Sequence, residues 1–154
     1  MNTIIPRFAY GIVAEDGERF FEFAKFPEII SAVGPGDFEG MTADDVRSFA
    51  HDAVVSALVA RMSTRQDMPQ GDDDATVCDG FVDLDVVEAM KLALYDVYLR
   101  NFRTVAEFAA RIGKSETAAR RLLDFRHNSR PAEIEAAMEQ LGKRLHHEWR
   151  LIAA

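Results

Sequence analysis

Residues 104–124, TVAEFAARIGKSETAARRLLD, combine side chains that can contact DNA with the spacing of two short helices joined by a tight turn. Arginine bonds bidentately to guanine, serine and threonine bond phosphates or bases, and glutamate accepts a hydrogen bond from cytosine. We expect Arg120 and Arg121 to read bases. The complete expected DNA-binding set is Thr104, Lys114, Ser115, Glu116, Thr117, Arg120, Arg121, Arg126, His127 and Arg130.

The turn inside this segment has the features of a helix-turn-helix. Such a motif needs a small residue where the first helix crosses the second, followed by a sharp turn. Ala109 and Gly113 supply these features, and residues flanking the second helix are placed to meet phosphates, which set register more than sequence preference. The side chains expected to close the small core are Phe108, Ile112, Ala119 and Leu122. A plain pair of helices with a solvated basic face is the alternative.

The charge of the chain changes sign shortly before the motif. Residues 1–85 hold 6 lysines and arginines against 17 aspartates and glutamates, whereas residues 86–154 hold 12 against 9. A weakly basic half with a groove-reading motif suits a polyanion, and a strongly acidic half suits a basic partner. The total charge of −8 therefore hides two different surfaces.

This shift, in a chain of 154 residues, predicts two small units, 1–85 and 86–154. Units of that size bury only a marginal core and often share it with a second copy, so we expect a homodimer or a dimer of dimers. Apolar residues near the C-terminus have little reason to be exposed singly and are candidates for that contact. They are Leu145, Trp149, Leu151 and Ile152.

The pattern of the first unit predicts strands and one long helix. Residues 8–14 and 19–26 are rich in aromatic and β-branched residues around a turn at 15–18, which indicates a hairpin, and 29–33 and 81–84 are further strand candidates. Apolar residues at helical spacing after Thr42 predict a helix over 43–62. Residues 34–40 and 63–80 are expected to be loops, the second one mobile, with a solvated acidic run at Asp72-Asp73-Asp74.

The second unit has a helical period throughout. Capping residues predict a helix over 86–101, another from Thr104 to Gly113, a third that begins at Ser115, and a fourth that Pro131 opens and Gly142 ends. The expected fold class is therefore α+β, with a β-β-β-α-β unit followed by an all-α helix-turn-helix domain.

Several kinds of chemistry have no support in the sequence. The four histidines lie apart or adjacent without metal-ligand spacing, so we expect no metal, no cofactor and no catalytic residue. Cys78 is the single cysteine and is expected to be inert. The chain has no long apolar run, which predicts no membrane contact and a cytoplasmic location.

The sequence resembles the HicB antitoxin family, in the subgroup with a C-terminal helix-turn-helix. The resemblance covers most of residues 7–145 and is most specific in the second half, in MKLALY at 90–95, GKSETAARRLLD at 113–124 and LGKRL at 141–145. In the first half it rests on the hairpin 8–26 with its Phe-Pro-Glu end, the helix after Met41-Thr42, and the Met68-Pro69 loop.

The resemblance implies that the first unit is a partial ribonuclease H-like fold that masks a small basic HicA-type toxin, an mRNA-cleaving ribonuclease. It also implies that the helix-turn-helix represses the operon for both proteins, with two copies on a palindromic operator of double-stranded DNA. As a hypothesis, exposed residues of the first unit meet the toxin. These are Phe21, Glu22, Phe23 and Glu28.

Two alternatives remain open. A stand-alone helix-turn-helix repressor with a sensing or dimerising first unit shares every DNA-binding argument. A ribonuclease H-like enzyme would need carboxylates converging from its first strand, and residues 8–14 have none at their centre; Asp83 and Asp85 are better explained as the end of a strand and the cap of a helix.

Overall fold

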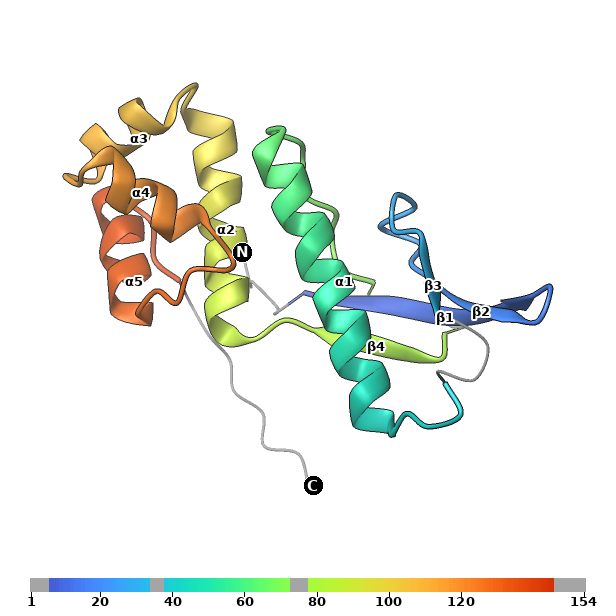
Figure 1. Ribbon diagram of the computed structural model, residues 1–154. Helices are drawn as coiled ribbons and strands as arrows, with labels where there is room; N and C mark the ends of the chain where they lie inside the picture. The colour runs from blue at the N-terminus through green and yellow to red at the C-terminus, as the bar shows by residue number, and fades with distance from the viewer. Residues whose placement is uncertain (1–5, 34–37, 73–77, 146–154) are drawn as a thin grey trace. The chain divides into compact units, whose positions relative to one another are not determined.

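The computed structural model describes residues 6–33, 38–72 and 78–145 (Figure 1). Within these residues the protein is mixed α+β, with four strands and five helices. The chain separates into two compact units, 6–84 and the residues from 85 onward. Some residues of the sequence predictions lie outside the described ranges: Asp73, Asp74, His146, His147, Trp149, Leu151 and Ile152.

The first unit is built on an antiparallel sheet in the order β3-β2-β1-β4. Its strands are β1 Arg7–Glu15, β2 Glu18–Glu22, β3 Ser31–Val33 and β4 Gly80–Asp83. The predicted hairpin is confirmed, because β1 pairs with β2 from Gly11↔Glu22 to Glu15↔Glu18. Asp16 and Gly17 at the turn both have positive φ, 51° and 81°, which is the backbone that an Asp-Gly hairpin turn requires.

The second strand is shorter than the sequence pattern predicted, ending at Glu22 instead of Phe26. The chain turns there, with the Phe26 amide donating to the Phe23 carbonyl at 3.0 Å. This turn brings Phe26 edge-on against Phe8, with ring centroids 4.9 Å apart. The sequence pattern could not predict this turn, because an apolar residue such as Phe26 fits an extended strand and a buried turn equally well.

Helix α1, Ala43–Ser63, covers one face of the sheet (Figure 1). Thr42 and Asp45 form the capping box that predicted its start, each side chain accepting from the other's backbone amide. Its core residues are Ala50, Val54, Ala57 and Leu58. At its other end Arg61 lies over the Phe26 ring at 5.1 Å, which joins the end of the helix to the turn after β2.

The segment after α1 is more ordered than the sequence predicted. The Asp72 amide donates to the Arg7 carbonyl at 2.8 Å, and its carboxylate accepts from the Ala9 amide at 3.0 Å. On the opposite edge of β1, the Asp79 carboxylate accepts from the Ile12 amide at 2.6 Å. The expectation that Asp72 is merely a solvated charge was therefore wrong, because it satisfies backbone groups of β1 where β2 has already turned away.

The second unit consists of short helices whose starts match their capping signals. They are α2 Val86–Asn101, α3 Val105–Arg111, α4 Glu116–Leu123 and α5 Pro131–Gln140. Capping boxes at Asp85 and Thr104, and the Ser115 hydroxyl at α4, fix three of these starts. Aromatic contacts join α2 to α3, with Tyr98 and Phe108 centroids 5.4 Å apart. No helix within the described residues is long and apolar enough to cross a membrane.

Candidate functional site

A tight turn joins α3 to α4. Gly113 has a φ of +66°, a conformation that costs an L side chain energy, and the Lys114 amide donates to the Ala109 carbonyl at 3.0 Å. The Ser115 hydroxyl then accepts from the Ala118 amide at 3.2 Å and starts α4. The turn therefore ends one helix and begins the next within a few residues.

The side chains expected to form the core beneath this turn are buried. Phe108 and Ala119 are fully buried, and Ala109, Ile112 and Leu122 are each less than 5% exposed. This confirms the predicted inward face of the two helices. Once that face is buried, the outward face of α4 is determined.

The outward face of α4 carries the predicted cations. Arg120 and Arg121 are exposed, as is Thr117. Arg120 forms an ion pair with Glu116 one turn earlier on the helix. Among the described residues the Arg121 guanidinium makes no ion pair, so it can reach an anion without first breaking one.

Two hydroxyls of the predicted DNA-binding set serve the helices themselves. Thr104 Oγ1 accepts from the Glu107 amide at 3.1 Å, as Ser115 does at the start of α4. Each hydroxyl keeps its proton for a further acceptor such as a phosphate oxygen, because the cap uses only an oxygen lone pair. Lys114 is half-buried beside Ser115.

A buried ammonium organises the end of α4, and the sequence did not predict it. Lys91 on α2 has no exposed surface, and its Nζ donates to the backbone carbonyls of Arg121 at 3.1 Å, of His127 at 2.6 Å and of Asp124. These carbonyls belong to the last turn of α4 and the loop that follows. Burial lowers the pKa of Lys91, and the carboxylates of Asp124 and Asp85 oppose that effect.

The loop after α4 presents the remaining predicted cations. Arg126 and Arg130 are exposed and His127 is half-buried, with its Nδ1 3.2 Å from the Ser129 hydroxyl. Ser129, itself buried, also donates to the Arg121 carbonyl at 3.3 Å. The buried side chains of Lys91 and Ser129 therefore bind the backbone of this segment from the interior, while Arg126 and Arg130 are exposed to solvent. A Lys within an apolar helix face gives no periodic signal, which is why the pattern missed this role.

In the acidic unit, half of the expected contact residues are not at the surface. Phe21 and Phe23 are 3% and 2% exposed, and both rings pack near Tyr10, at centroid distances of 5.4 and 6.2 Å. The expectation that they are exposed was wrong: Phe21 lies on the face that α1 covers, and Phe23 lies in the turn that follows β2. They stabilise the core.

The two expected acidic contacts differ from each other. Glu22 is exposed, whereas Glu28 accepts from Arg61, with Arg61 Nη2 3.0 Å from Glu28 Oε2. The hydrogen bond from Arg61 lowers the pKa of Glu28, and the same contact raises that of Arg61. Glu28 is therefore held by Arg61 although it too is exposed, whereas among the described residues Glu22 makes no ion pair.

A recess of about 410 Å³ lies between the start of α1 and the β4 edge. Its lining includes Arg7 and Arg47, which are paired with Asp83 at 3.1 Å and with Asp44. Burial raises the pKa of Tyr10 at its base. Within the described residues no three His, Cys, Asp or Glu side chains are grouped as a metal ion would need.

These features define a two-unit α+β protein, with an acidic sheet-and-helix unit and a helical unit that exposes arginines after a tight turn. No family model matches the chain. It is similar to Antitoxin HicB of Pseudomonas fluorescens (strain Pf0-1), with 29% identity over 144 residues, 94% of each chain. Antitoxin HicB 1 of Photorhabdus laumondii is 25% identical over 92% of this chain and 87% of its own, and Antitoxin HicB of Escherichia coli (strain K12) is 25% identical over 86% and 90%.

These similarities, at 25–29% identity over most of the chain, support a HicB family antitoxin. The matched residues extend over both units of the chain.

Proposed function

We propose that this protein is an antitoxin that neutralises a small basic HicA-type, mRNA-cleaving toxin through its acidic unit, and represses its own operon through α3 and α4 acting as a helix-turn-helix. The observation that carries the antitoxin role is the similarity to an Antitoxin HicB over 94% of both chains. The division of charge supports it, because residues 1–85 hold 17 acidic and 6 basic residues and a basic toxin would be attracted to them.

The DNA-binding part of the proposal rests on the α3–α4 pair. Its inward face is buried, its turn is sharp, and α4 exposes Arg120, Arg121 and Thr117. In this reading α4 enters the major groove, while Lys114, Arg126, His127 and Arg130 lie near phosphates, together with the hydroxyls of Thr104 and Ser115. Two copies would read two half-sites of a palindrome.

The antitoxin role is tested by mixing the full chain with a small basic protein encoded by an adjacent gene and following cleavage of an RNA substrate. We expect cleavage to stop near equimolar antitoxin. If the full chain neither binds nor inhibits that protein yet still binds DNA, the function is instead that of a stand-alone repressor.

The DNA role is tested with the sequence upstream of the gene and a random duplex of equal length. We expect Arg121→Ala to weaken specific binding by about 1–3 kcal/mol and random binding much less. Arg65→Ala, which removes the same charge from the acidic unit, is the control. Equal losses on both duplexes would make Arg121 a phosphate contact, and no specific binding by the parent chain would reject the repressor role.

A further inference from the structure

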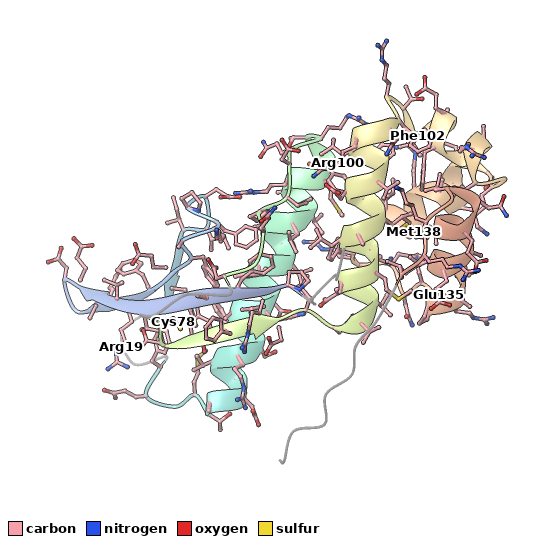
Figure 2. The ribbon with its side chains drawn as sticks, turned by 180° about the vertical axis from the view of Figure 1, so that it is seen from behind. Arg19, Cys78, Arg100, Phe102, Glu135 and Met138 are labelled. Atoms are coloured by element: carbon pink, nitrogen blue, oxygen red, sulfur yellow. The ribbon has the colours of Figure 1, made fainter. Side chains whose placement is uncertain are left out.

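The sheet of the acidic unit has one covered face and one open face. Pairing places Tyr10, Ile12 and Phe21 on the same face, because Ile12 lies opposite Phe21 and alternate residues of β1 share a side. The Phe21 ring stacks on Phe49 of α1 with centroids 5.4 Å apart, so this is the face that α1 covers. Among the described residues of 6–84, α1 is the one helix, so no described helix of this unit covers the opposite face. Figure 1 shows α1 in front of the strands, and Figure 2 views the sheet from behind.

The open face has an apolar centre. Val13 is 43% exposed, and its β2 partner Phe20 is only half-buried. A Cβ built on Gly11 would approach only the Asp79 carboxylate, at 3.8 Å, so there is space above the strand at that point. Phe81 lies opposite Ala9, half-buried beneath the Arg7 guanidinium at 4.1 Å. Large side chains left partly exposed on one sheet face are typical of a contact surface.

Carboxylates accompany this centre on the same face. Glu15 and Glu18 are paired across the hairpin, and Glu22 lies opposite Gly11, all three exposed. Asp83 is at the other end, where it neutralises Arg7 at 3.1 Å. We define the open sheet face by these apolar and acidic residues: Gly11, Val13, Glu15, Glu18, Phe20, Glu22, Phe81 and Asp83.

We propose that the open sheet face is the docking surface for the basic toxin. This inference rests on the proposed function and names the surface that performs it. The apolar centre would be desolvated against a neutral patch of the toxin, and Glu15, Glu18 and Glu22 would pair with lysines or arginines around that patch. Carboxylates placed on the same face as an apolar stripe give a specific partner both attraction and register.

A second copy of the chain fits this surface less well. A two-fold contact through the open sheet face would place the same three carboxylates of each copy near those of the other, and like charges across an interface oppose association. A basic partner removes that repulsion. The negative charge of the open sheet face therefore favours a basic toxin over a second copy of this chain.

The test compares four variants of the full chain for binding to the small basic protein encoded by an adjacent gene. Glu15→Lys with Glu22→Lys reverses charge on the open face, and Glu39→Lys with Asp52→Lys makes the same change at exposed positions elsewhere in the unit. Val13→Asp removes an apolar contact from the face, and Ile30→Asp does so at a site 91% exposed outside it. Thermal unfolding reports whether each variant is folded.

We expect the two open-face variants to weaken toxin binding by roughly 100-fold for the charge reversal and tenfold for Val13→Asp, with their matched controls close to the parent. If the parent binds and the controls weaken binding as much as the open-face variants, the surface is wrong and the antitoxin role stands. If Val13→Asp instead converts a dimer of this chain into a monomer, the face is occupied by a second copy. If the parent does not bind at all, the proposed function fails and this surface assignment fails with it.

Discussion

At the scale of single residues, Lys91 has the clearest energetic consequence. Lys91 has no exposed surface, and its ammonium is the donor for three backbone carbonyls. In Lys91→Met the side chain keeps its length but those carbonyls lose their partner, and each unsatisfied buried acceptor costs about 1–3 kcal/mol. We expect the free energy of unfolding, measured with urea, to fall by roughly 2–4 kcal/mol.

The matched control is Lys143→Met, because Lys143 is exposed and its loss should change stability little. A Lys91→Met variant as stable as the parent would show that apolar packing at this position compensates for the lost hydrogen bonds.

Glu28 predicts a pH dependence with a definite sign. The hydrogen bond from Arg61 lowers its pKa below 4.5, so the folded state binds this proton less tightly than the unfolded state. A carboxyl of this kind stabilises the fold fully above about pH 5.5 and loses that effect as the pH falls through its folded value. We expect Glu28→Gln to be less stable than the parent at pH 7, by less than about 1 kcal/mol because the pair is partly solvated.

This difference should shrink toward pH 3 in urea unfolding measured at both pH values. Glu39→Gln is the control, an exposed carboxyl with no ion pair among the described residues. A difference that stays constant with pH would mean that Glu28 acts through packing and not through charge.

The burial of a single side chain was predictable where its type and spacing allow one interpretation, and it was not predictable where they allow two. Leu122 and Phe108 were placed correctly because helical spacing distinguishes the inner face from the outer one. Phe21 and Phe23 were misplaced because a phenylalanine in a strand pattern can face a core or a partner equally well. Lys91 was missed because a buried lysine depends on carbonyls 30 or more residues away in sequence.

At the scale of elements, helix starts were predictable and strand ends were not. The starts at Thr42, Asp85 and Thr104 follow from local capping hydrogen bonds three residues apart, which the sequence displays directly. The end of β2 and the placing of Asp72 depend on which segment pairs with β1, a choice made by residues over 60 positions apart. Nonlocal pairing of this kind leaves no periodic trace.

The pairing of Asp72 with β1 makes a prediction about the sheet. Its side chain is 11% exposed, lies 3.8 Å from the Lys25 ammonium and accepts from the Ala9 amide. Asp72→Ala leaves that amide without its acceptor, and we expect a loss of about 1–2 kcal/mol in the free energy of unfolding.

Asp72→Asn retains an oxygen acceptor while removing the charge, so it should retain most of the stability. Hydrogen exchange of the Ala9 amide gives a local reading, faster in Asp72→Ala than in Asp72→Asn. Equal exchange in the two variants would show that the strand does not depend on this hydrogen bond.

At the scale of the whole molecule, one chain carries surfaces of opposite character, with a net charge of −11 over residues 1–85 and +3 over the rest, obtained from 6 basic and 17 acidic residues against 12 and 9. The acidic unit attracts a basic protein and repels DNA at long range. Neutralising Glu15, Glu18 and Glu22 together to glutamine should therefore affect the two proposed functions in opposite directions. Toxin binding should weaken because three charge pairs are lost.

DNA binding by the same triple variant should strengthen by a few-fold at low salt, equally on operator and random duplexes, because the change removes a general repulsion and no base contact. The gain should largely disappear near 0.5 M salt, where the screening length falls to about 4 Å. Arg121→Ala provides the opposite pattern, a loss that depends on DNA sequence. A triple variant that bound DNA no better at any ionic strength would mean that the acidic unit does not influence DNA binding through its charge.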